Sequence, residues 1–214
     1  LKRFNLKKTS MLYAVMLKNK AFVLGILILG LAYSTVMVFN IAGPFVVEHH
    51  FGFNAVTTGY CTLILGISWM IGGILSKTFS NYNFPKKLRI STFIQVVLLI
   101  LFVIVAMQLD QLYLLVGFAF IIHIVSGFIF TNYFTQNMIY FPSNAGIAGG
   151  LIGGLLYIIT SISSFLISSS GNIATTFDMS LRYLGVGIPL VLVIFYSSFL
   201  ILKKQQKKTK ITTV

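Results

Sequence analysis

The sequence predicts an all-α integral membrane protein with six transmembrane helices, arranged as two inverted three-helix repeats. Of its 214 residues, 57% are apolar and only 9% are charged, and the mean hydropathy is +0.94. A soluble domain carries about 25% charged residues, and disordered chains are poor in apolar residues, so both classes are excluded. Barrel strands are excluded because the apolar runs are about twice the length of a membrane strand and do not alternate.

Six segments are long enough to cross a hydrocarbon core of about 30 Å, which requires roughly 20 apolar residues. They are residues 21–47, 54–76, 89–109, 112–140, 145–170 and 181–202. We therefore expect a transmembrane domain over 21–202, a basic linker over 1–20 and a basic tail over 203–214.

The basic linker has two interpretations, and the sequence does not decide between them. It could lie on the inner leaflet, attracted by anionic lipids, with four apolar side chains inserted. It could equally extend into solvent as a charged linker. The side chains that would insert are Phe4, Tyr13, Met16 and Leu17.

The distribution of charge fixes the expected orientation. Six cations precede the first span, four flank the connection between spans two and three, and five follow the sixth span. The opposite side holds Arg182 and all three acids, Glu48, Asp110 and Asp178. Because positive residues stay in the cytoplasm, both termini are predicted there, in a bacterial inner membrane. The net charge of +13 then reflects membrane topology, and no nucleic-acid partner is expected.

The composition of the spans predicts the two repeats. The third span contains no glycine, and the sixth is mostly large aliphatic after its first residues, whereas the first, second and fifth are rich in glycine. Small residues permit close helix contact in lipid, so spans three and six are expected outside and the other four inside. The order interior, interior, outer occurs twice, and three helices per copy invert the second copy.

The fifth span carries a stripe of small residues. Gly146, Gly150 and Gly154 recur every four residues, and hydroxyl-bearing side chains continue the same face. This face could be one wall of a translocation path, or a tight helix seam whose serines bond to their own helix. The side chains that continue the stripe are Tyr157, Ser161, Ser164 and Ser168.

His123 is the ionisable side chain nearest the middle of a span. An ionisable group at that depth is a functional candidate by default, but without a partner carboxylate a neutral histidine bonded across a helix seam is favoured. At 100° per residue, the face of His123 also contains Ser126, Gly127, Phe130, Phe134 and Asn137.

The first span aligns Tyr33, Met37, Asn40 and Pro44 on one face. Gly43 and Pro44 should weaken the backbone hydrogen bonds near its end, since proline lacks the donor. A bent gate and a static kink are both compatible with this. Trp69, in the second span, is interpreted as a packing residue in preference to a substrate platform.

Few residues suit enzymatic or metal chemistry. Cys61 is the single cysteine, so no intrachain disulfide can form. Glu48, His49 and His50 lack further ligands nearby in sequence, and no acid pair or nucleophile–base spacing occurs at membrane depth. We expect no cofactor, no metal and no enzymatic activity.

Three stretches resemble the C-terminal half of a major facilitator superfamily transporter, most closely the bicyclomycin-resistance (Bcr/CflA) type of drug:proton antiporter. YAVMLKNKAFVLGILILG (13–30) is similar to the central linker and seventh helix, GPFVVEHHFGFNAVTTGY (43–60) to the loop before the eighth, and FPSNAGIAGGLIGGLLY (141–157) to the start of the eleventh. The resemblance covers about residues 5–200. It departs from the family in LSKTFSNYNFPKK, which lacks the acid and most arginines of the signature loop.

The resemblance implies half of a transporter that exports small amphipathic organic compounds or drugs by proton antiport with alternating access. A second six-helix half, in a missing segment or a separate chain, would complete the cavity, and a second copy of this chain is an alternative. A non-transporting remnant or assembly subunit remains a further hypothesis. The expected cavity residues are Tyr33, Met37, Asn40, His123, Phe130, Phe134, Asn137, Ser161 and Ser164, and those expected for packing or gating are Gly43, Pro44, Gly146, Gly150 and Gly154.

Overall fold

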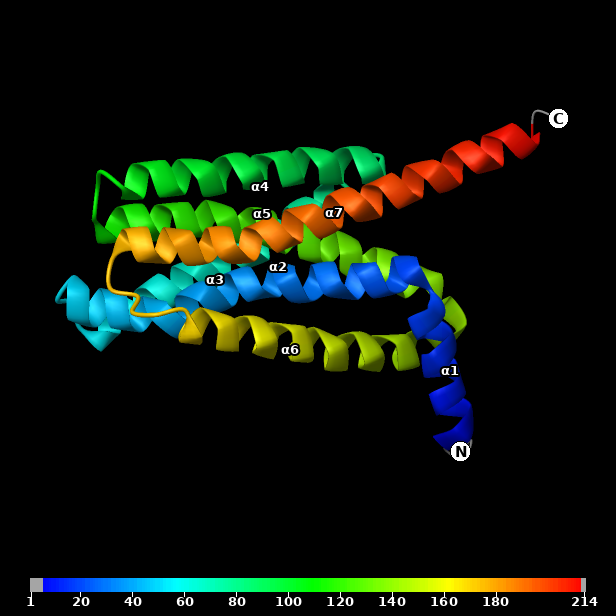
Figure 1. Cartoon of the computed structure of the whole chain (residues 1–214), viewed down its shortest axis with the longest axis horizontal. Coiled ribbons are helices and arrows are strands. Elements are labelled where there is room, and N and C mark those ends of the chain that lie inside the picture. Colours follow the sequence, from blue (N-terminus) through cyan, green and yellow to red (C-terminus); the bar gives the residue numbers. More distant parts are fainter. Residues whose placement is uncertain (1–5, 213–214) are drawn as a thin grey trace.

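Six helices of the computed structural model are long and apolar enough to cross a membrane. The structure describes the backbone of residues 6–212 and the side chains of residues 9–200, and every regular element within that range is helical. Figure 1 shows the long helices side by side in one bundle, with a short helix crossing its end. The elements are α1 (Leu6–Lys18), α2 (Lys20–Phe45), the π-helix η1 (Val46–His50), α3 (Ala55–Thr78), α4 (Phe84–Ala106), α5 (Leu112–Tyr140), the 3₁₀ turn η2 (Pro142–Asn144), α6 (Ala145–Ser169) and α7 (Thr176–Thr212).

Asparagine side chains begin three of the spans. Asn19, Asn54 and Asn83 each accept hydrogen bonds from backbone N–H groups in the first turn of α2, α3 and α4. Such caps satisfy donors that have no partner inside the helix. The cap at Asn83 explains why α4 starts five residues before the predicted span, with Lys86 and Lys87 in its first turns.

The last span also starts earlier than its hydropathy predicts. The carboxylate of Asp178 accepts the backbone N–H of Thr175 at 3.0 Å, and the hydroxyl of Thr175 accepts the N–H of Asp178 at 3.1 Å. This reciprocal pair is a capping box, and it lets α7 begin at Thr176 although the first residues are polar.

The basic linker is helical where it is described, as α1. Figure 1 shows that α1 turns sharply away from α2 and lies across the end of the bundle. Met16 is fully buried and Tyr13 is partly buried against the bundle, whereas Leu17 is 46% exposed. Two of the side chains that the inner-leaflet interpretation placed in lipid therefore face protein, and Phe4 lies outside the described residues.

The end of the first span departs from α-helical geometry, as the Gly43–Pro44 pair predicted. Pro44 lies inside α2, and the chain widens into the π-helix η1 from Val46 onward. Gly52, with a φ of 72°, ends this segment in the left-handed conformation that glycine adopts without strain. Whether this end moves as a gate stays a prediction.

Two central helices hold the bundle together. α2 and α5 pack against each other; α3 and α4 pack on α5, while α6 and α7 pack on α2, and α4 contacts α7. α2 and α5 are the most buried spans, and α3 and α6 are the least buried. The expectation that α3 and α6 lie inside, and α4 and the last span outside, was wrong within this chain, because α3 and α6 are less buried than α4 and α7 and six of their nine glycines meet no other helix of the described chain.

α3 and α5 approach so closely that their backbones touch. A Cβ atom added at Gly72 would overlap the carbonyl oxygen of Ile124, and one added at Gly127 would lie 2.7 Å from the carbonyl oxygen of Trp69. Backbone atoms cannot move aside cheaply, so these two positions require glycine. This crossing is a small-residue contact of the kind that joins helices in lipid.

The charged residues separate to the two ends of the bundle. Both ends of the described chain lie at the same end in Figure 1. There, Lys77 at the end of α3 and Lys86, Lys87 and Arg89 at the start of α4 flank the α3–α4 connection, and we term this the basic end. Glu48, Asp110 and Asp178 lie where α2 ends and where α5 and α7 begin, and we term this the acidic end.

We expect Gly72→Ala to lower the free energy of unfolding by about 1–3 kcal/mol, the usual cost of overpacking. Gly66→Ala is the matched control, because Gly66 lies on the same helix and a Cβ there would meet nothing within 4 Å. The control should be neutral or slightly stabilising, since alanine favours helices over glycine. Denaturation of both variants in detergent micelles measures this, and equal losses would contradict the α3–α5 contact.

Candidate substrate-facing surface

Four aromatic rings from three helices form a connected cluster. Trp69 on α3 lies 6.0 Å from Tyr33 on α2 and 5.3 Å from Phe130 on α5, between ring centroids. Phe134 stacks on Phe130 at 6.2 Å and is 39% exposed. We term Tyr33, Trp69, Phe130 and Phe134 the aromatic cluster. Three of its members were predicted as cavity residues, and Trp69 joins them.

Met37 and Asn40 continue the face of Tyr33 along α2. Tyr33 and Met37 are half-buried, and Asn40 is exposed. A side-chain amide at this position is available to a ligand, with one carbonyl acceptor and two N–H donors. The face thus offers adaptable apolar contact and one polar group that can orient a bound molecule.

His123 and Asn137, also predicted to line the cavity, are fully buried inside the bundle. Nε2 of His123 is hydrogen-bonded to the hydroxyl of Tyr183 on α7 at 3.0 Å. The amide of Asn137 donates to the carbonyl of Phe22 at 3.2 Å and fills the space beside Gly25 on α2. The structure therefore does not bring these two side chains to the aromatic cluster; each links α5 to a neighbouring helix.

The division within α5 has a simple geometric cause. His123, Phe134 and Asn137 share a face by helical phase, but phase states only the direction of a side chain and not what lies in front of it. At the level of His123, α7 covers the helix, whereas Phe134 remains 39% exposed. Helices that cross at an angle cover one face at some depths and leave it open at others.

Ser161 and Ser164 lie on the least buried of the spans, α6. Ser161 is exposed and Ser164 is half-buried. Within the described part of the chain, neither side chain is hydrogen-bonded to its own helix, unlike Ser163, which donates to the carbonyl of Ile159 at 3.0 Å. Their hydroxyl groups are therefore free for another partner.

The small-residue stripe of α6 faces open space. A Cβ atom added at Gly146, Gly150 or Gly154 would meet nothing within 4 Å, so no helix of the described chain packs on these glycines. The close seam that the sequence allowed at this stripe is not made within the chain. Whether another molecule covers it stays a prediction.

α3 carries a second uncovered stripe that the sequence analysis missed. Gly59 and Gly66 also meet nothing within 4 Å, and Thr62 and Met70 share their face at 100° per residue. The recurrence of small residues near every fourth position was visible in the sequence. It was overlooked because glycine in this span was assigned to internal packing.

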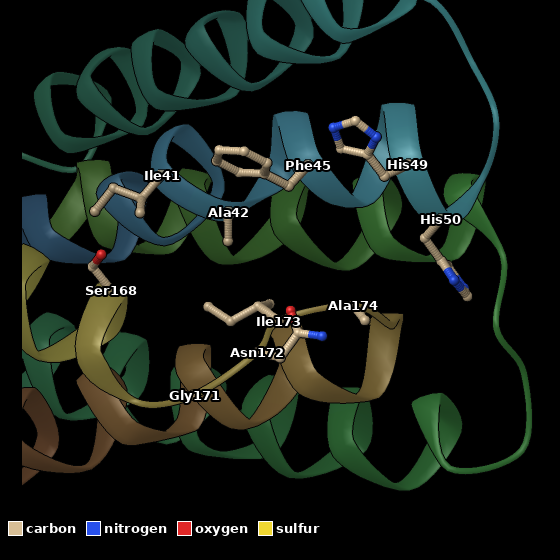
Figure 2. A pocket seen from close by; sticks show the side chains of 10 residues that line it. All are labelled: Ile41, Ala42, Phe45, His49, His50, Ser168, Gly171, Asn172, Ile173 and Ala174. Carbon is tan, nitrogen blue, oxygen red and sulfur yellow. The ribbon is translucent and has the colours of Figure 1, made fainter.

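A pocket of about 390 Å³ lies at the acidic end. Figure 2 shows the loop of residues 171–174 passing beside the end of α2, with Ile173 facing Ala42. His49, His50 and Asn172 give this pocket polar groups. It lies next to the end of the Tyr33–Asn40 face, since Ile41 also lines it.

Asp110 connects three segments beside this pocket. Its carboxylate bonds Nε2 of His50 at 2.6 Å and accepts the backbone N–H of Thr176 at 3.1 Å. Partial burial raises the pKa of Asp110, but the hydrogen bonds from Thr176 and His50 outweigh it, so the pKa lies below its ordinary value. The ionised carboxylate therefore fastens the ends of α2 and α7 to the α4–α5 connection.

The acidic and histidine side chains make pairwise contacts. Glu48 accepts a hydrogen bond from the hydroxyl of Thr58 at 3.0 Å, and His50 pairs with Asp110. Within the described residues, no group of three His, Cys, Asp or Glu side chains is placed to hold a metal ion.

No protein-family model and no curated protein matches this chain.

Proposed function

We propose that this chain is one half of an alternating-access transporter of the major facilitator superfamily, which exports small amphipathic organic compounds by proton antiport. The observation that carries the proposal is a partly exposed aromatic cluster on α2, α3 and α5, accompanied by uncovered small-residue stripes on α3 and α6. Large aliphatic residues face lipid, whereas small residues permit close helix approach. The stripes therefore fit a second set of helices, with the aromatic cluster enclosed between the halves.

The order of faces around α3 and α6 supports an inverted repeat. Each residue is rotated by about 100° from the one before it. In that direction of rotation, the buried face is followed by the small stripe and then by the large aliphatic face on both helices. The helix contacts keep the same pattern when α2, α3 and α4 are exchanged with α5, α6 and α7. The α3–α5 contact then corresponds to α6–α2, and the α2–α7 contact corresponds to α5–α4. A two-fold axis in the membrane plane would produce both regularities.

The chemistry of the surface favours amphipathic substrates. Aromatic rings and Met37 offer polarisable contact that tolerates different shapes, and Asn40 supplies a polar group to orient the molecule. Ser161 and Ser164 add hydroxyl groups on α6. Together they resemble ligand sites that are largely apolar with a few directing polar groups.

Proton coupling would draw mainly on the partner half. All three acids of this chain lie in connections or at helix ends, and His123 is bonded to Tyr183 inside the bundle. A carboxylate at membrane depth must therefore come from the partner, with His123 as the one histidine of this half at that depth. A second copy of this chain could cover the same stripes, but it would bring no carboxylate to membrane depth, so a homodimer would lack this part of the coupling.

The single tryptophan makes the aromatic cluster directly observable. We expect tetraphenylphosphonium, an amphipathic cation, to quench the fluorescence of Trp69 in a saturable way in membranes containing the chain. Tyr33→Ala should raise the dissociation constant about three- to tenfold, because an aromatic pair contributes about 0.5–1.5 kcal/mol. Tyr113→Ala is the control, since Tyr113 is 73% exposed at the start of α5 and outside the cluster. If neither tetraphenylphosphonium nor other amphiphiles quench Trp69, the aromatic cluster is not a substrate surface. Equal dissociation constants for the Tyr33→Ala and Tyr113→Ala variants would lead to the same conclusion.

We further propose that the basic end faces the cytoplasm of a bacterial inner membrane, because positive residues are retained on that side. In a Cys61→Ser background, a cysteine at Ser80 in the α3–α4 connection should react with a membrane-impermeant maleimide only in inside-out vesicles. A cysteine at Asn172 should react only in right-side-out vesicles. Labelling of both positions from one side would exclude six crossings in this orientation.

A further inference from the structure

We propose that a groove between α3 and α4 binds one anionic phospholipid, with an acyl chain in the groove and the phosphate against Lys86 and Lys87. The proposal depends on the chain spanning a membrane and is independent of transport.

The groove exists because α3 and α4 both pack on α5 and leave a gap between them. It has a volume of about 450 Å³. Leu75 and Phe79 form one wall, Ile90 and Ile94 form the other, and α5 closes its floor with side chains that include Phe128. From Lys87 to Ile94, α4 rises about 10 Å at 1.5 Å per residue, so the groove has the length and apolar lining for part of an acyl chain.

The basic end of the groove supplies the charge. Lys86 and Lys87 both line it, and the ammonium group of Lys87 donates to the carbonyl of Phe79 at 3.3 Å, across the mouth. An ammonium group has three N–H donors, so two remain for a phosphate. Tyr82 also lines the mouth and is 62% exposed, as suits an aromatic ring at the level of lipid headgroups.

The position of the groove on α3 favours lipid over a protein partner. By helical phase, Leu75 and Phe79 lie on the far side of α3 from the stripe of Gly59 and Gly66, and next to its large exposed aliphatic residues. A helix packed on the small stripe would therefore leave the groove open to the bilayer.

The charge distribution selects an anionic headgroup. All three acids of the chain belong to the acidic end, so none competes for the two lysines. The pocket at the acidic end, lined by α2, η1, α6 and the α6–α7 loop, contains histidine and asparagine but no lysine or arginine. Basic pockets between transmembrane helices are the sites where anionic headgroups bind.

Native mass spectrometry of the full chain, titrated with phosphatidylglycerol or phosphatidylcholine, tests the proposal. We expect one phosphatidylglycerol to bind about thirtyfold more tightly than phosphatidylcholine, because each lysine contributes about fivefold toward an anionic lipid. The paired substitution Lys86→Gln with Lys87→Gln should remove this preference. The matched control is Lys77→Gln with Arg89→Gln, which removes the same charge from the same end but from residues outside the groove, and it should keep the preference.

A second variant tests the apolar part of the site. Ile94→Trp should fill the groove and weaken phosphatidylglycerol binding, while inorganic phosphate at millimolar concentration should not displace the lipid. Equal binding of the two lipids, or equal losses in the lysine pair and its control, would overturn the proposal in favour of general attraction to a basic surface. Displacement by inorganic phosphate, or unchanged binding by Ile94→Trp, would show that no acyl chain occupies the groove.

Discussion

The structure depends on how closely two helices can approach in lipid. Between transmembrane helices the hydrophobic effect gives little attraction, because lipid tails are as apolar as the side chains, so packing and hydrogen bonds decide which faces meet. Gly72 and Gly127 bring the backbones of α3 and α5 into contact, and Gly30 admits Ile159 of α6 beside α2. α3 and α6 are thus each fixed to a central helix at a position where a larger residue would not fit.

The same constraint explains why α3 and α6 each carry small residues that no helix of the described chain covers. Small residues are used within the chain at the two contacts described above, yet α3 and α6 each present a further stripe of them to open space. The aromatic cluster on α2, α3 and α5 accompanies these stripes. A second set of helices packed on the stripes would enclose the rings, whereas the large aliphatic faces would remain in lipid. The proposed half-transporter follows from this division of α3 and α6 into a buried face, a small stripe and a large aliphatic face.

The sequence predicted the number and approximate limits of the spans, because length and hydropathy alone determine what can cross a bilayer. It missed the early starts of α4 and α7, which depend on the caps at Asn83 and at Thr175 with Asp178. Helical phase correctly grouped Tyr33 with Met37 and Asn40, but it also grouped His123 with Phe134. Only the crossing of neighbouring helices distinguishes a buried position from an open one. Trp69 was interpreted as a packing residue, and its ring packs against Tyr33 and Phe130; contact with a substrate stays a prediction, because a single ring in a sequence does not reveal its neighbours.

The most direct test asks which face of α6 meets another protein. In a Cys61→Ser background, a cysteine at Gly154 lies on the small stripe, and one at Leu166, about 120° around the helix by phase, lies on the aliphatic face, where the native side chain is 61% exposed. Crosslinking in native membranes should join the Gly154 position to a partner half or a second copy, and leave the Leu166 position unlinked. Crosslinks at both positions, or at neither, would contradict the account of α6 as an interface helix.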